Sequence, residues 1–174
     1  VADTETVLSY EAGVKAQLWE NRVRIGFAAY RYTVNDQQLT AVGGNANVAR
    51  LVNADRTVGQ GVELDVQAWL TNNLYVTFGA SYNDTEIQDA ALAVFGCGGG
   101  CTMRDPAGTV PGTFRINGNA LPQAPKHVYN VTARYGIPTS HGEFFAYTDW
   151  AYRSKVNFFL YESTEFTGDP LLEG

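Results

Sequence analysis

The chain of 174 residues is 45% hydrophobic and 17% charged, which excludes a disordered segment and favours one sizeable structural unit. A formal net charge of -6, with only 12 Lys and Arg scattered along the chain, argues against a nucleic-acid partner because phosphate binding depends on clustered basic residues. No apolar run approaches the roughly 20 residues that a transmembrane helix requires.

The first part of the chain predicts a long β-hairpin. It opens Val1-Ala2-Asp3, without a Met, a basic segment or an apolar segment, so we expect any secretory signal to lie outside this sequence. Apolar and polar residues alternate over residues 8–18 and again over residues 23–29, with a short turn at residues 19–22. Each stretch therefore presents one apolar face and one polar face.

Beyond Ala29 this alternation slips, because the large residues Tyr30 and Tyr32 fall on the polar face. Two explanations stay open at this point. One is a bulge near Ala28 and Ala29, and the other is that the strand leaves a hydrocarbon environment there. Residues 35–55 are polar and rich in Gly and Asn, and they predict a long loop with room for its ends to extend the flanking strands.

The clearest pattern covers residues 58–82 and predicts a second hairpin. Aliphatic residues at positions 62–70 alternate with Glu63, Asp65 and Gln67, and the alternation resumes after a turn at residues 71–73. Each arm carries about nine alternating residues, whereas an ordinary strand has about five or six. A tilted membrane-spanning strand needs about 9 to 11 residues, so the length favours a membrane β-barrel.

The remaining chain predicts a long loop over residues 84–125 and two further strands at residues 129–137 and 144–152. Residues 170–174 are loop-like. Connections thus alternate between short and long, as in outer-membrane barrels with short periplasmic turns and long extracellular loops. The prediction is an all-β, antiparallel up-and-down meander of about six long strands. Since a closed membrane barrel needs about eight, it is a partial, open segment of something larger.

Five segments, in this order and spacing, carry a resemblance to a known family. They are Ser9-Tyr10-Glu11-Ala12-Gly13-Val14-Lys15, Asn21-Arg22-Val23-Arg24, Gly59-Gln60-Gly61-Val62-Glu63-Leu64, Leu121-Pro122-Gln123-Ala124-Pro125-Lys126 and Asp149-Trp150-Ala151-Tyr152-Arg153-Ser154. Together they resemble the barrel half of TonB-dependent outer-membrane receptors over nearly the whole chain. The resemblance implies a 22-stranded barrel in the bacterial outer membrane, of which residues 1–174 supply about six strands and no plug domain.

The same resemblance implies a function and partners. It implies active uptake of a scarce ligand, such as a ferric siderophore or another metal chelate, powered by the TonB complex through a plug domain absent here. Outer-membrane lipid is the expected surroundings of the strands. The alternatives are a passive porin-like or structural outer-membrane barrel, and a soluble carbohydrate-binding β-sandwich. We expect no enzyme and no cofactor, because His141, Asp149 and a serine show no spacing that supports a hydrolase triad.

Candidate site residues fall into three groups. Cys97 and Cys101 predict a disulfide, since zinc or haem would need more ligands than two distant histidines supply. The long loops offer aromatic and cationic contacts to an anionic chelate: Phe95, Arg104, Phe114 and Arg115. The expected lumen-facing polar residues are Glu63, Asp65, Asp149, Arg153 and Lys155. These five are interpreted first as a salt-bridged lining of a hydrated interior and second as a binding site.

Overall fold

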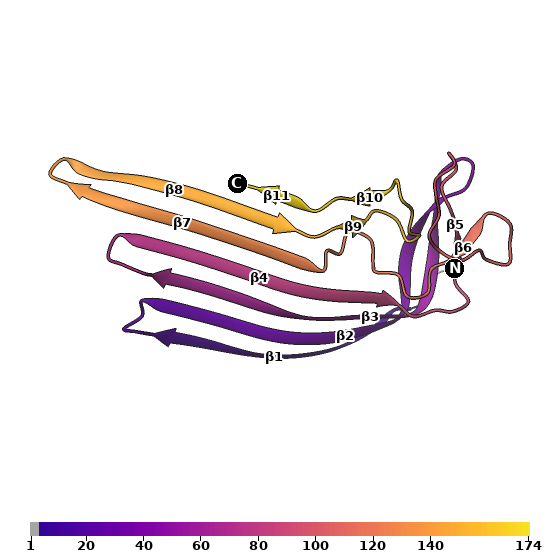
Figure 1. Ribbon diagram of the computed structural model, residues 1–174. Coiled ribbons are helices and arrows are strands. Elements are labelled where there is room, and N and C mark those ends of the chain that lie inside the picture. Colours follow the sequence, from indigo (N-terminus) through magenta and orange to yellow (C-terminus); the bar gives the residue numbers. More distant parts are fainter. Residues whose placement is uncertain (1–3) are drawn as a thin grey trace.

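One large antiparallel sheet dominates the computed structural model, which describes residues 4–174 (Figure 1). Its strand order is β1-β2-β3-β4-β7-β8-β11, so neighbours in the sheet follow one another along the chain. The six long strands are β1 (Thr6–Leu18), β2 (Val23–Gly43), β3 (Val48–Trp69), β4 (Leu74–Ile87), β7 (His127–Thr139) and β8 (Gly142–Arg153). The predicted all-β meander of about six long strands is confirmed. Val1 to Asp3 lie outside the described residues, and the expectation that any secretory signal lies outside this sequence stays a prediction.

Five short strands complete the structure. They are β5 (Ala93–Phe95), β6 (Thr113–Arg115), β9 (Val156–Asn157), β10 (Thr167–Gly168) and β11 (Leu171–Glu173). Residues 4–174 hold no helix that is long and apolar enough to cross a membrane. Because β11 pairs with β8, the prediction that residues 170–174 are loop-like is wrong: backbone pairing with Ala151 to Arg153 outweighs the weak local pattern.

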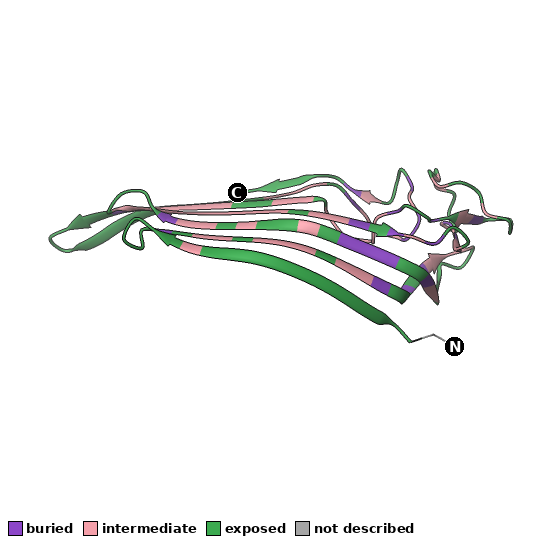
Figure 2. Cartoon of the chain, turned by 90° about the horizontal axis from the view of Figure 1, so that it is seen from below, coloured by how far each residue is buried: buried purple, intermediate pink, exposed green. Residues whose placement is uncertain are grey.

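The six long strands form a single layer. We define its apolar face as the one that carries Val62 and its polar face as the one that carries Glu63. Val62 is 41% exposed, and no second layer of the described chain covers the apolar face (Figure 2). A two-layer sandwich is therefore wrong for this chain.

Strand register explains the slip after Ala29. β1 and β3 both pair with β2 without a shift through Ala28 and Ala29, so there is no bulge at these residues. The apolar face becomes polar one row beyond Ala29. In that row Arg31 of β2 pairs with Gln60 of β3, and Gln60 pairs with Asp84 of β4. The apolar stripe thus ends at one level on three neighbouring strands, which agrees with the second explanation for the slip.

The predicted loop at residues 35–55 is largely wrong. β2 continues to Gly43 and β3 begins at Val48, so this segment is the far end of a long hairpin. Its pairing holds because Leu39 and Ala41 alternate with polar residues and are buried. Their burial comes from contact with distant loops, and sequence composition alone did not reveal it.

Those loops form a compact unit at the end of the sheet opposite the short turns (Figure 1). We call it the loop head, comprising residues 37–54, 87–125 and 154–170. Its hydrophobic core consists of Leu39, Ala41, Ala54, Ile87, Val94, Ile116, Leu160 and Tyr161. We call the remaining sheet the wall, comprising β1, β2 up to Asn35, β3 from Arg56, β4 up to Glu86, β7 and β8. Buried residues gather in the loop head and at the ends of the long strands next to it, as Figure 2 shows in purple.

Candidate functional site

The polar face of the wall brings together four of the five residues expected to face a lumen. Glu63 pairs with Ser81, Ser81 with Val128 and Val128 with Arg153, so Glu63 and Arg153 share a face. Two-residue periodicity places Asp65 and Asp149 on that face as well. Lys155 lies beyond the end of β8 and is exposed.

The expected salt-bridged lining does not form between these residues. Among residues 4–174, none of the five makes an ion pair. The ion pair that the polar face does carry joins Arg134 Nη2 to Glu143 Oε2 at 2.6 Å, near the short turns. Glu63 and Asp65 therefore present carboxylates without a paired cation, and Asp65 Oδ1 accepts a hydrogen bond from Gln67 Nε2 at 3.3 Å.

A shallow groove of about 330 Å³ surrounds these two carboxylates. Its lining includes the small residues Gly26, Ala28, Gly79, Ala80 and Ser81, and Lys15 of β1. Position 79 requires glycine, because a Cβ there would collide with the side chain of Asn130 on the neighbouring strand. The groove can therefore offer hydrogen-bond acceptors and a cation to water or to a polar partner.

Two tyrosines account for the glycines at positions 59 and 61, also on the polar face. A Cβ on Gly59 would collide with the ring of Tyr32, and one on Gly61 would collide with Tyr30 and with the Tyr82 carbonyl. The Tyr30 hydroxyl crosses β3 and donates to Asn83 Oδ1 at 2.9 Å. Glycine at these two positions thus lets the tyrosine rings pack directly on the backbone of β3.

An aromatic row marks the end of the apolar face nearest the loop head. Tyr82 packs on His127 with ring centroids 5.3 Å apart, and Tyr129 packs on Tyr152 at 5.8 Å.

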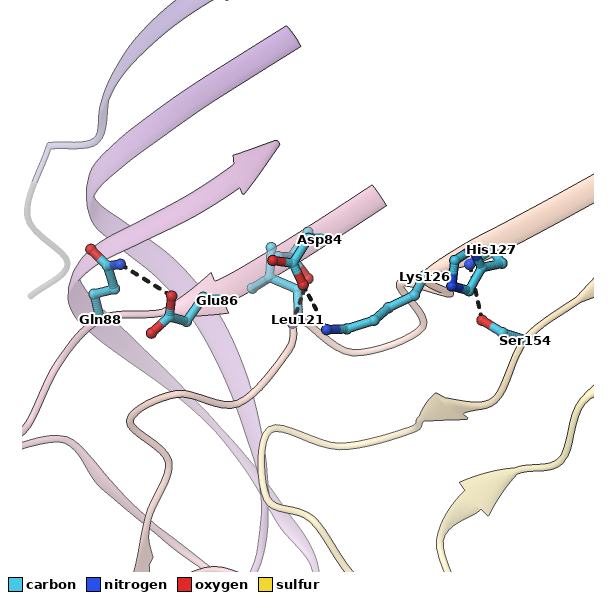
Figure 3. A network of polar contacts seen from close by, with 8 residues as sticks. Asp84, Glu86, Gln88, Leu121, Lys126, His127 and Ser154 are labelled. Carbon is cyan, nitrogen blue, oxygen red and sulfur yellow. Dashed lines mark hydrogen bonds and ion pairs between the residues drawn. The ribbon is translucent and has the colours of Figure 1, made fainter. Parts of the chain in front are cut away.

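At the junction with the loop head, Lys126 Nζ lies 2.7 Å from Asp84 Oδ1 (Figure 3). This hydrogen bond raises the pKa of Lys126.

The same junction is tied by the backbone. The His127 amide donates to Ser154 Oγ at 3.0 Å, and Figure 3 shows this bond beside the ion pair. The Leu121 amide donates to Thr85 Oγ1, also at 3.0 Å. The contacts fix the loop before β7 against β4 and the start of β7 against the segment that follows β8. They therefore set where the loop head sits on the wall.

Within the loop head, Cys97 and Cys101 are joined by a disulfide, with Cα atoms 6.1 Å apart. Beside it lies a cavity of about 390 Å³. Phe95 of β5 and Phe114 of β6 both line it, so two of the four expected ligand contacts come together.

The two expected cations do not line this cavity. Arg104 and Arg115 are exposed on other parts of the loop head. Two other residues, which the sequence did not single out, lie at or near this cavity. Met103 lines the cavity, and Arg50 lies over the Phe95 ring at 5.4 Å from its centroid. Arg50 is 45 positions earlier in the chain, so no local pattern connects it to Phe95.

Polar contacts hold two loops of the head together. Asp105 Oδ2 accepts a hydrogen bond from the Glu162 amide at 2.7 Å, and Asp105 Oδ1 accepts one from Asn119 Nδ2 at 3.1 Å. Burial raises the pKa of the Asp105 carboxyl, and these hydrogen bonds only partly oppose the rise. The Thr102 amide donates to Glu165, which lowers the pKa of that carboxyl. Among residues 4–174, no three His, Cys, Asp or Glu side chains gather to hold a metal ion.

The geometry gives the hydrolase triad no support. His141 lies in the turn before β8, and its Nδ1 is 2.9 Å from Ser140 Oγ. Asp149 is on β8, seven residues beyond its start at Gly142. At about 3.3 Å per residue, His141 and Asp149 are too far apart along the strand for a hydrogen bond.

Comparison with known proteins gives one family and several similar structures. The family model described as "TonB dependent receptor-like, beta-barrel" matches residues 3–170. A search of curated proteins finds no match.

Three solved structures share the fold. They are the ferric yersiniabactin uptake receptor FyuA from Yersinia pestis (TM-score 0.67, 15% identity, 97% of this chain covered), the siderophore receptor PiuA from Acinetobacter baumannii (0.65, 16%, 95%) and the ferric preacinetobactin receptor BauA from Acinetobacter baumannii (0.63, 14%, 95%). This chain spans 21% of the length of each. At these identities the likeness shows the fold alone.

Proposed function

The chain belongs to the TonB-dependent receptor β-barrel family, and from this premise we propose that it forms part of an outer-membrane receptor that takes up a scarce ligand such as a ferric siderophore. The observation that carries the proposal is the bare apolar face of the wall. A single-layer sheet with large apolar side chains exposed along one face needs an apolar solvent, and the hydrocarbon of a bilayer supplies one.

The aromatic row supports this placement. In membrane barrels, aromatic girdles lie at the interfaces that flank the apolar band. Here the Tyr82 and Tyr129 rows stand at the end of the apolar stripe, and the polar row of Arg31, Gln60 and Asp84 follows at once. That sequence of rows matches the change from hydrocarbon to lipid headgroups.

The open edges support a larger assembly. The outer edge of β1 is unpaired among residues 4–174, and β11 covers only three residues of β8. Backbone N–H and C=O groups left unpaired in hydrocarbon cost several kcal/mol each, so other strands must pair there. We therefore propose that further barrel strands belong to the same protein outside residues 1–174. Family membership adds the proposal of a plug domain, through which the TonB complex acts.

The polar face then lies towards the barrel interior. The carboxylates of Glu63 and Asp65, which no cation pairs, can hydrogen-bond water or the plug, and the loop head stands outside the cell as the first surface that a ligand meets. The ligand class rests on the solved relatives, three of which are named as receptors for siderophores or their ferric complexes. For this chain, a ferric chelate is accordingly the ligand to test first.

The test uses the full-length protein in cells that lack their other ferric-chelate receptors. We expect accumulation of ⁵⁵Fe supplied as a panel of ferric siderophores, and we expect that accumulation to stop when TonB is deleted. TonB-independent accumulation that follows the external concentration would instead support a passive porin. A plug domain encoded upstream of Val1 in the same open reading frame would count against the porin independently.

A second experiment tests the orientation of the wall. Val62→Cys and Glu63→Cys are adjacent and exposed, but they lie on opposite faces. With a nitroxide label on the full-length protein in lipid, we expect oxygen to reach position 62 better and a water-soluble relaxant to reach position 63 better. Equal access of both reagents to the two positions would contradict a lipid-facing apolar face.

A further inference from the structure

We propose that the cavity beside the Cys97–Cys101 disulfide binds an uncharged aromatic ring carried by the ligand. The proposal rests on the receptor function above and deepens it by naming the chemical group that the loop head contacts. The volume of about 390 Å³ falls within the roughly 300 to 1,000 Å³ of small-molecule sites and is ample for one ring with its substituents.

The lining chemistry selects a ring over a charged group. Phe95, Phe114 and Met103 give the cavity aromatic faces and a polarisable thioether, both of which pack favourably against a ring. No charged side chain of residues 4–174 lines it, and Arg50 lies over the Phe95 ring rather than among the lining residues, so an anionic metal centre would lose its hydration there without a direct partner. Asn45 is also among the lining residues, so polar groups are available to orient a ring hydroxyl.

The cavity walls are tied together before any ligand arrives. The tip of the β2–β3 hairpin docks on the disulfide loop, where the Gly44 amide donates to the Gly96 carbonyl at 2.8 Å and Gly44 forms a β-bridge with Cys97. A Cβ on Gly98 would collide with the Gly44 carbonyl, so this docking requires glycine. The disulfide closes the same loop covalently. A site held in this way loses little conformational entropy on binding.

The experiment uses ¹⁹F NMR on the full-length receptor in lipid nanodiscs, with 4-fluorophenol as the aromatic probe and 4-fluorocyclohexanol as an aliphatic probe of similar size. We expect saturable binding of the phenol, with an affinity at least about fivefold above that of the cyclohexanol. Phe114→Leu keeps an apolar side chain but removes an aromatic face, and should weaken phenol binding about fivefold.

The matched control is Phe158→Leu. Phe158 lies in the same loop head and is exposed, but it does not line the cavity, so this change should alter phenol affinity less than about twofold. Met103→Trp gives a second test because it fills the cavity, and it should abolish saturable binding while limited proteolysis shows the loop head intact. If Phe114→Leu disturbs the fold, the phenol binding of Met103→Trp tests the proposal.

Three results would overturn the proposal: no saturable phenol binding by the wild type, equal affinity for both probes, or unchanged binding in Met103→Trp. The NMR readout does not depend on transport. Loss of the proposed receptor function would appear as absent TonB-dependent uptake with probe binding intact. Failure of the cavity alone would appear as intact uptake without selective binding of the ring.

Discussion

The wall and the loop head differ in what surrounds their apolar side chains. In the wall, Phe144 is 72% exposed and Tyr10 is 67% exposed, and no other part of the described chain covers them. In the loop head, Ile116 is fully buried and Leu160 is 2% exposed. The head is therefore organised like a small water-soluble core, whereas the wall depends on a solvent that is itself apolar.

Because of this difference, the same kind of substitution should change the free energy of unfolding by different amounts in the two regions. Removing a methylene group costs free energy where protein atoms surround it and little where lipid can fill the space. Introducing a charge costs most where the surroundings have no water. Four experiments on the full-length protein test this difference between the wall and the loop head, beginning with the largest expected effect.

Truncation of a core side chain in the head gives the largest effect. Ile116→Ala should lower the free energy of local opening of the head by about 2 to 5 kcal/mol, because it leaves a cavity among Ile87, Val94 and Leu160. Hydrogen exchange of the head amides measures it. The matched control, Ile137→Ala, removes the same atoms from a wall residue that is 52% exposed, and should cost less than about 1 kcal/mol. Equal costs at the two positions would contradict the division into wall and head.

A charge on the wall comes next and tests its two faces. Val66→Arg places a cation on the apolar face and should destabilise the barrel in lipid by about 2 to 4 kcal/mol, as for charges near the bilayer midplane. Gln67→Arg places the same cation one residue along, on the polar face, and should change stability by less than about 0.5 kcal/mol. Urea titration in lipid vesicles compares the two. A similar loss for both would mean that the faces do not differ in solvent.

Removal of the disulfide has an intermediate effect confined to the head. The double change Cys97→Ser with Cys101→Ser should lower head stability by about 2 kcal/mol, since the five-residue loop is no longer closed in the unfolded state. Hydrogen exchange in the wall should stay unchanged. Gly99→Ala is the control within the same loop, because a Cβ there meets nothing within 4 Å. Loss of protection spreading into β3 and β4 would show that the head and wall unfold together.

The pH dependence of the head is the smallest effect. Because burial raises the pKa of Asp105, the folded head holds a proton that the unfolded chain releases above about pH 3.9. The contribution of Asp105 to stability therefore falls as pH rises from about 3.9 through the raised pKa, and it is constant above that window. Asp105→Asn should remove this dependence in hydrogen exchange, after correction for intrinsic rates.

Glu165 is a control for that experiment because its expected pH dependence has the opposite sign. The hydrogen bond from Thr102 lowers the pKa of Glu165, so its contribution is present above about pH 4.3 and is lost as pH falls through the lowered pKa. Glu165→Gln should therefore remove a stabilisation that disappears in acid. The effect is small because the carboxylate is exposed and salt screens it. The same pH trend for both variants would contradict the assigned causes.

Much of the wall could be predicted from the sequence, and little of the head. Alternation placed Glu63, Asp65, Asp149 and Arg153 on one face, and the register agrees. Of the expected ligand contacts, only the two phenylalanines meet at a cavity, which Met103 and the disulfide complete. Residues 35–55 looked like a loop because polar residues, Gly and Asn dominate them, although Leu39 and Ala41 carried a weak alternating signal.

The faces and the order of the long strands could be read from the amino-acid sequence alone, because successive residues of a strand point to opposite sides and their polarity reflects the solvent on each side. Only the tertiary structure decided the loop head. Asn119 donates to the Leu160 carbonyl at 2.9 Å, and Arg50 reaches Phe95, across separations of 41 and 45 residues. Such contacts follow no period along the chain, since they depend on how irregular loops pack against one another once the sheet holds their ends.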